Sequence, residues 1–173
     1  CVRPPRHLCQ TRGSMSPGRI ADGLRAFLGL PDRLEFVSEV RGVRYINDSC
    51  STTPESTIEG LRAYEKPVLL ILGGKDKGMD LDAIVREASL RARQVFLVGK
   101  IAPDLLARFQ ASAAKGPLER VVEAGTLDRA VKEAAAAAAS GETVLLSPAF
   151  ASTDQFRNYQ ERAAAFKRLV GAL

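Results

Sequence analysis

The chain of 173 residues contains one histidine, His7, and no tryptophan. A single histidine leaves no second histidine for a proton relay or a metal cluster within this chain. The three cysteines, Cys1, Cys9 and Cys50, form no CxxC pair, and their odd number leaves one unpaired. We therefore expect neither a disulfide framework nor a zinc site, and we interpret Cys50 as a small filler rather than a nucleophile.

Long hydrophobic runs are also missing, since no apolar stretch approaches the roughly 20 residues of a membrane span. The N-terminus is charged but has no apolar segment of the kind found in signal peptides. We therefore predict a cytoplasmic chain without a membrane partner.

The net charge of +5 is concentrated at one end of the sequence. Residues 1–20 contain four arginines and no acidic residue, so the rest of the chain is nearly neutral. Because basic residues and aromatics are not interleaved elsewhere, we do not expect a nucleic-acid partner. Residues 1–15 show no periodicity and are predicted to be a disordered or disturbed arm. The chain begins with Cys rather than Met, and we expect a piece of a longer protein.

From residue 16 onward, short apolar runs alternate with helical patterns. This order predicts a single α/β domain with a Rossmann-like, mostly parallel sheet and helices on both faces. The expected strands are 34–40 and 43–46 as a hairpin, then 68–72, 95–98, 120–122 and 143–146. The first expected helix begins at residue 16. The other expected helices cover 55–64, 80–91, 102–113, 127–139 and 154–170.

Three polar loops, 47–55, 73–78 and 147–154, each follow an apolar strand. We expect them at one edge of one sheet, where open α/β folds bind ligands. In the second loop, Lys75 and Lys77 could bind a carboxylate or phosphate, and Asp76 could orient one of them. The alternative is an ordinary turn with solvated lysines.

The first and third loops are rich in hydroxyl and carboxylate side chains. Both precede helical patterns, and helix N-termini suit anions. In the third loop Ser152, Thr153 or Asp154 is expected to cap the following helix. Capping without a ligand remains the alternative for both loops.

Two common nucleotide motifs are absent from the sequence. Gly73 and Gly78 have the spacing of a P-loop, but Met79 and Asp80 follow where Lys and Ser or Thr are needed. No strand is followed by Gly-x-Gly-x-x-Gly. The chain therefore lacks both of the usual devices for holding a nucleotide by itself.

Four ordered motifs carry a resemblance to a known family. They are Leu30-Pro31-Asp32-Arg33-Leu34-Glu35, Asn47-Asp48-Ser49-x-x-Thr52, Leu72-Gly73-Gly74-x-Asp76-Lys77-Gly78 and Leu146-Ser147-Pro148-Ala149-x-Ala151-Ser152-x-Asp154-Gln155-Phe156. Over about residues 16–173 the chain resembles the C-terminal domain of the muramyl (Mur) ligases. Within them it is most similar to the ATP-dependent ligases that add glutamate to UDP-N-acetylmuramoyl-L-alanine in peptidoglycan biosynthesis.

The resemblance implies a three-domain enzyme. An N-terminal domain would bind the UDP-sugar, and a central domain would carry the P-loop, the Mg²⁺ ligands and a carbamylated lysine. The C-terminal domain would bind the incoming glutamate and close over ATP. The reaction would make an acyl phosphate, which the amine of glutamate attacks. Because the P-loop is absent here, we expect no ligase turnover from this chain alone.

The resemblance also assigns residues. Thr52, Lys77, Ser152 and Thr153 would hold the glutamate carboxylates, with Tyr159 nearby, and Arg33 and Asp48 would contact ATP. It implies no catalytic residue and no metal ligand in this domain. Two positions depart from the family pattern: Asp32 stands in place of the common His, and Cys50 in place of the common Lys. The choice between D- and L-glutamate stays open.

Two other interpretations are possible. The chain could belong to another ligase of the superfamily, such as a folylpolyglutamate synthase, although the runs 147–149 and 154–156 argue against this. It could also be a noncatalytic α/β module that binds a ligand or a partner protein.

Overall fold

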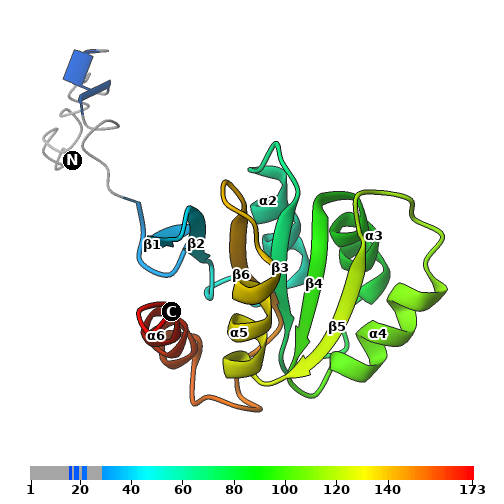
Figure 1. The fold of residues 1–173 in the computed structure, drawn as a ribbon. Helices are drawn as coiled ribbons and strands as arrows, with labels where there is room; N and C mark the ends of the chain where they lie inside the picture. Colours follow the sequence, from blue (N-terminus) through cyan, green and yellow to red (C-terminus); the bar gives the residue numbers. More distant parts are fainter. Residues whose placement is uncertain (1–15, 17, 20, 23–28) are drawn as a thin grey trace, which may run out of the picture.

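In the computed structural model, the described residues are 16, 18, 19, 21, 22 and 29–173 (Figure 1). The predicted arm 1–15 and most of the helix predicted from residue 16 lie outside them. Six strands and five named helices follow in the order β1, β2, α2, β3, α3, β4, α4, β5, α5, β6, α6. No helix of the described part is long and apolar enough to cross a membrane.

The six strands form one sheet in the order β1-β2-β6-β3-β4-β5 (Figure 1). Only β1 and β2 pair in antiparallel fashion, as the predicted hairpin, and all other neighbours are parallel. The predicted mostly parallel sheet is therefore confirmed. The strands are β1 Glu35–Val40, β2 Val43–Asn47, β3 Val68–Gly73, β4 Ala92–Val98, β5 Arg120–Gly125 and β6 Thr143–Ala149.

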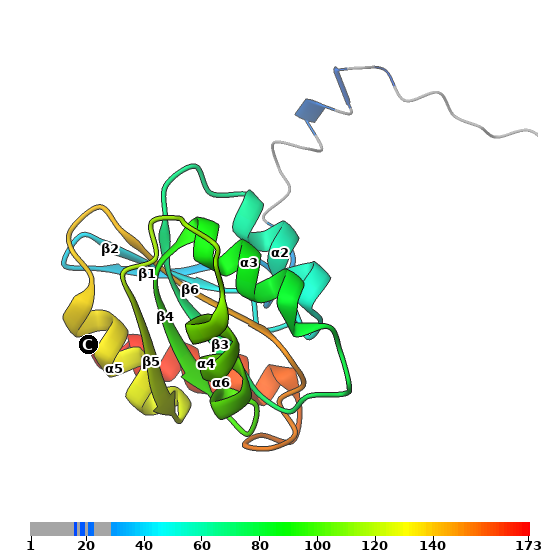
Figure 2. The ribbon, with the colours of Figure 1, turned by 90° about the vertical axis from the view of Figure 1, so that its right-hand side faces the viewer.

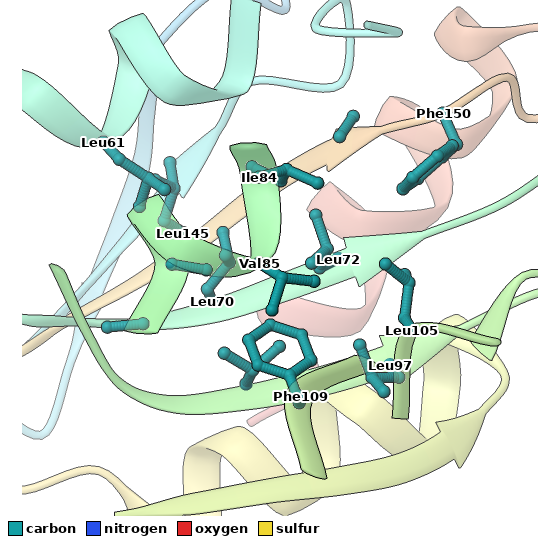
Figure 3. Packing of buried hydrophobic residues seen from close by; sticks show 14 of the residues in the cluster. Leu61, Leu70, Leu72, Ile84, Val85, Leu97, Leu105, Phe109, Leu145 and Phe150 are labelled. Carbon is teal, nitrogen blue, oxygen red and sulfur yellow. The ribbon is translucent and has the colours of Figure 1, made fainter. Parts of the chain in front are cut away.

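Helices cover both faces of this sheet, as seen in Figure 2, where the molecule is turned by 90° from the view of Figure 1. Helices α2 Pro54–Arg62, α3 Leu81–Arg91 and α4 Ala102–Ala111 pack on one face, and α5 Leu127–Ala137 and α6 Tyr159–Val170 on the other. In Figure 3, Leu70, Leu72 and Leu145 of the strands meet Leu61 and Ile84 of the helices. Because alternate side chains of β3 point to opposite faces, this strand supplies both cores and is fully buried.

Side-chain caps begin several helices where the sequence places a hydroxyl or carboxylate. Thr53 caps α2 in a capping box with Ser56, and Pro54 occupies the first helical turn. Asp80 caps α3, and Thr126 caps α5. These caps fix where each loop ends and each helix begins.

The last helix begins later than predicted. Asn158 caps α6 by accepting a hydrogen bond from the Glu161 N–H at 2.8 Å, so residues 154–158 precede the helix. The prediction that Ser152, Thr153 or Asp154 caps a helix is therefore wrong. Instead the carbonyl of Ser152 accepts the N–H groups of Gln155 and Phe156, which forms an isolated turn.

Glycines allow backbone segments to touch where β3 and β4 end. A Cβ at Gly73 would overlap the carbonyl oxygen of Val98, and one at Gly74 would overlap that of Ala151. Both glycines have positive φ, 131° and 145°, which side chains disfavour. The sequence run Gly73-Gly74 is thus required by close packing against β4 and the third loop.

Substituting two loop glycines should separate this close packing from backbone strain alone. Gly78 also has positive φ, but nothing lies within 4 Å of a Cβ built there. We expect Gly78→Ala to lower the free energy of unfolding by about 1 kcal/mol. Gly73→Ala should lower it by about 3 kcal/mol, because backbone must move as well. Urea denaturation measures both, and equal losses would contradict the packing argument.

Candidate functional site

The three polar loops meet at the carboxyl edge of the sheet. They follow β2, β3 and β6, and β6 lies between the other two strands, parallel to both. Two backbone hydrogen bonds join them: Ala149 N–H donates to the Ser51 carbonyl at 3.0 Å, and Lys75 N–H to that of Ala151 at 2.8 Å. The predicted meeting of these loops at one edge is confirmed.

Asp48 ties the first loop to two other segments. Its Oδ1 accepts the Leu34 N–H at 3.2 Å, and its Oδ2 accepts the Ser147 hydroxyl at 2.6 Å. The Thr57 hydroxyl oxygen lies 3.0 Å from Ser147 Oγ and extends the chain of contacts into α2. The Asp48 side chain is 1% exposed. In this conformation its carboxylate therefore organises the loop from inside.

Arg162 of α6 is a site residue that the sequence analysis missed. Its Nε and Nη2 donate to the hydroxyl and the carbonyl of Ser49, both at 3.0 Å. Its Nη1 donates to the Phe150 carbonyl at 3.1 Å. One guanidinium, only 2% exposed, thereby joins the first and third loops.

The environment of Arg162 is unusual because the three oxygens that it binds are neutral. Burial lowers the pKa of the guanidinium to about 10, although the charge of Asp154 acts in the opposite direction. The group remains protonated at neutral pH, so it leaves positive charge beneath the loops. It lines a small cavity together with Ser152, Gly74 and Gln155.

The sequence did contain a signal for Arg162. It lies three residues after Tyr159 and four before Phe166, so helical spacing places it on the apolar face of the last helix. A charged residue on that face must be satisfied by partners across the core.

The five residues predicted to bind glutamate all lie in or beside the three loops. Ser152 is buried, with 3% exposure, whereas Thr52 and Tyr159 are half-buried and Lys77 and Thr153 are exposed. The Tyr159 carbonyl accepts the Ser49 hydroxyl at 2.8 Å, which attaches the start of α6 to the first loop. The fold thus gathers the candidates at one edge.

Asp76 has a different role from the one predicted. Its Oδ1 accepts the backbone N–H groups of Lys77 at 2.7 Å and Met79 at 3.2 Å. The carboxylate therefore shapes the second loop rather than orienting a lysine ammonium group. The loop in turn presents the Lys77 side chain at the surface.

Arg33, predicted on the ATP side, is exposed in the turn that leads into β1. Asp32 precedes it, at the position where the resemblance expects His. The Asp32 Oδ1 accepts the Asn47 amide at 2.9 Å and the Lys167 ammonium at 3.2 Å. Asp32 is therefore engaged within the domain.

The described residues offer no cluster of three or more His, Cys, Asp or Glu side chains that could hold a metal ion. A cavity of about 560 Å³ does lie at the opposite, amino edge of the sheet, lined by Tyr64, Lys66 and Arg93 among others. Arg93 already forms ion pairs with Glu142 at 2.7 Å and Glu119 at 3.0 Å. We therefore interpret that edge as a structural ion-pair cluster.

A family model, described as the glutamate ligase domain of Mur ligases, matches residues 32–150. The chain belongs to this family. The match includes Arg33, Asp48, Thr52 and Lys77 and ends at Phe150, so the remaining three predicted glutamate residues lie beyond it.

Known relatives agree with the family assignment. The chain is 41% identical over 154 residues to the UDP-N-acetylmuramoylalanine–D-glutamate ligase of Thermoanaerobacter sp. strain X514, which covers 89% of this chain and 34% of the relative. It is 44% identical over 161 residues to that of Myxococcus xanthus, covering 93% and 34%. The chain therefore spans about a third of the length of these relatives.

Similar solved structures include more distant members of the fold. A bifunctional folylpolyglutamate synthase/dihydrofolate synthase from Yersinia pestis matches with a TM-score of 0.61 at 17% identity, covering 90% of this chain and 35% of that one. E. coli FolC in complex with ADP matches with a TM-score of 0.60 at 19% identity, covering 91% and 35%. At these identities the likeness establishes the Mur ligase domain fold alone.

Replacing Arg162 should destabilise the domain. We expect Arg162→Met to lower the free energy of unfolding by about 3 kcal/mol, because it strands three buried oxygens. Arg162→Lys should recover only part of this loss, since an ammonium cannot reproduce the guanidinium geometry.

Arg157→Met provides the control for Arg162, because Arg157 is exposed and pairs only at the surface with Glu161. This change should stay within about 0.5 kcal/mol of the unaltered chain. Urea denaturation compares the three variants. A loss below about 1 kcal/mol for Arg162→Met would contradict the clamping role.

Cys50 should react slowly with alkylating agents. Burial raises the pKa of its thiol, and the charge of Asp48 raises it further, while Arg33 opposes them. The test uses a chain in which Cys1 and Cys9 are changed to Ser. The rate at which iodoacetamide alkylates Cys50 should rise with pH, and the midpoint of that rise should be higher in the folded chain than in the urea-unfolded chain. A lower midpoint in the folded chain would instead indicate a thiolate activated by the helix N-terminus.

Proposed function

We propose that this chain is the glutamate-binding, C-terminal part of an ATP-dependent ligase that joins D-glutamate to UDP-N-acetylmuramoyl-L-alanine in peptidoglycan biosynthesis. The relatives at about 40% identity are D-glutamate ligases by name, which supports the reaction and the D isomer. The observation that carries the proposal is the adjacency of β2, β6 and β3, whose loops bring Thr52, Lys77 and Ser152 to one edge.

The chemistry of this edge suits an amino acid with two carboxylates. Lys77 offers an exposed ammonium group, and the Arg162 guanidinium adds buried positive charge near Ser152. The hydroxyls of Thr52, Ser152 and Thr153 can donate hydrogen bonds to carboxylate oxygens. Tyr159, half-buried at the start of α6, would pack beside the glutamate chain.

On the nucleotide side, Arg33 is suited to bind a phosphate of ATP, because its guanidinium is exposed. Asp48 is the second residue proposed for that side. Its buried carboxylate accepts hydrogen bonds from the Leu34 N–H and the Ser147 hydroxyl. In this conformation it stabilises the ATP side from within the domain, and it would contact ATP only after the turn at Leu34 opens.

Mg²⁺ and the UDP-sugar would be bound by the parts that the longer relatives have beyond the matched third. The described residues provide no cluster of His, Cys, Asp or Glu side chains for the metal ion. The domain boundaries proposed are residues 16–173 for the folded domain. The dependence on ATP favours the cytoplasm as its location.

Lys77→Ala tests the glutamate site directly. We expect the affinity of the chain for D-glutamate to fall about 10- to 100-fold, because a charged hydrogen bond is lost. NMR chemical-shift titration measures the affinity. Lys66→Ala is the matched control, because Lys66 is also exposed but precedes β3 at the opposite edge.

An unchanged D-glutamate affinity in Lys77→Ala would favour the alternative of a noncatalytic module with another ligand. Titration with L-glutamate addresses the other alternative, a ligase related to the folylpolyglutamate synthases that share the fold. Clear preference for the L isomer would count against the peptidoglycan assignment.

A further inference from the structure

The turn that presents Arg33 has an unusual backbone. Asp32 and Leu34, on either side of Arg33, both have positive φ, 61° and 43°, although neither is glycine. Side chains disfavour this left-handed region, so the surrounding structure must hold each residue there. The Arg33 N–H donates to the Leu30 carbonyl at 3.3 Å, which closes the turn. An exposed arginine is thus displayed on a backbone that would not adopt this shape alone.

Carboxylates hold the turn from below. The Asp32 N–H donates to Glu35 Oε2 at 2.9 Å, and the Leu34 N–H donates to Asp48 Oδ1 at 3.2 Å. The Asp32 carbonyl accepts the Cys50 N–H at 3.1 Å, which joins the turn to the first loop. Both left-handed residues are therefore fixed by hydrogen bonds to acidic side chains of the domain.

Lys167 of α6 neutralises this arrangement. Its ammonium group lies 3.2 Å from Asp32 Oδ1 and 2.8 Å from Glu35 Oε2, and the Asn47 amide donates to the same two carboxylates. Without a cation, two carboxylates this close would repel each other. Lys167 comes from a helix more than 130 positions later in the sequence and brings its charge to this turn.

The titration behaviour of the cluster agrees with its geometry. Burial alone would raise the pKa of Glu35, but hydrogen bonds from Lys167, the Asp32 N–H and Asn47 together lower it. Burial likewise acts to lower the pKa of Lys167, but its bonds to Glu35 and Asp32 raise it. Both groups are thus held in their charged forms at neutral pH.

We propose that Lys167 is a positioning residue for Arg33: through Asp32 and Glu35 it holds the strained turn in the shape that presents the guanidinium to a nucleotide phosphate. This rests on the proposed function, in which Arg33 binds ATP. Asp32, at the position where the resemblance expects His, then acts as a carboxylate held by a lysine of the last helix. Such preorganisation lowers the entropy lost when the phosphate binds.

Amide hydrogen exchange, followed by NMR on the full 173-residue chain, tests the structural part. In Lys167→Met, which removes the charge and keeps the length, exchange of the Asp32, Leu34 and Cys50 amides should accelerate about tenfold. Amides of β3 and β4 should keep their rates. Lys167→Arg should restore protection of the turn, because it restores the cation. Arg168→Met, at the exposed neighbouring position, should have no such effect.

ATP titration of the same variants tests the functional part. Lys167→Met should weaken ATP binding about fivefold, because Arg33 is no longer held in place for its charge-assisted contact with the phosphate. The affinity for D-glutamate should not change. Any one of three results would overturn the proposal: unchanged amide exchange at the turn, faster exchange throughout the domain, or unchanged ATP affinity. If ATP perturbs no signal near Arg33 in the unaltered chain, the nucleotide side of the proposed function fails instead, while the exchange rates still decide whether Lys167 holds the turn.

Discussion

The insertion of β6 between β2 and β3 is the constraint on which the site depends. β6 pairs in parallel with both neighbours, so the carboxyl ends of three strands from separate parts of the sequence lie side by side. All three polar loops then leave the sheet at one edge, and their backbones bond to one another. Without this crossover, Lys77 and Ser152 would belong to unrelated parts of the surface. Carboxyl ends of parallel strands at a change in strand order are a common place for ligands.

Helix α6 holds this edge together from one face of the sheet. Arg162 binds Ser49 and the Phe150 carbonyl, and Lys167 binds Asp32 and Glu35. One helix therefore positions the first loop, the third loop and the turn of Arg33. A movement of α6 would therefore displace residues of both the proposed glutamate site and the proposed ATP contact. Its role in joining two loops gives a physical reason for Arg162 within the apolar face of the helix. Burial of the guanidinium is unfavourable there unless its donors form hydrogen bonds.

The two positions at which the resemblance expects other residues are accommodated differently. Asp32, where the resemblance expects His, forms an ion pair with Lys167 and becomes part of the scaffold beneath Arg33. Cys50, where the resemblance expects Lys, is half-buried, and burial together with the charge of Asp48 raises the pKa of its thiol. The first loop therefore lacks the lysine that the resemblance expects, while the buried Arg162 donates a hydrogen bond to the carbonyl of Ser49 in the same loop.

The sequence by itself determined the strands, most helix starts and the order of the three loops, because these follow from local periodicity, buried runs and capping residues. It also carried the motifs by which the family is recognised. It misplaced the start of α6, since Ser152, Thr153 and Asp154 look like caps equal to Asn158 when only local chemistry is considered. Only the tertiary structure decided which charged side chains find partners. The bonds of Arg162 to Ser49 and of Lys167 to Asp32 join residues more than 110 positions apart, and the geometry that satisfies them exists only once the sheet has formed.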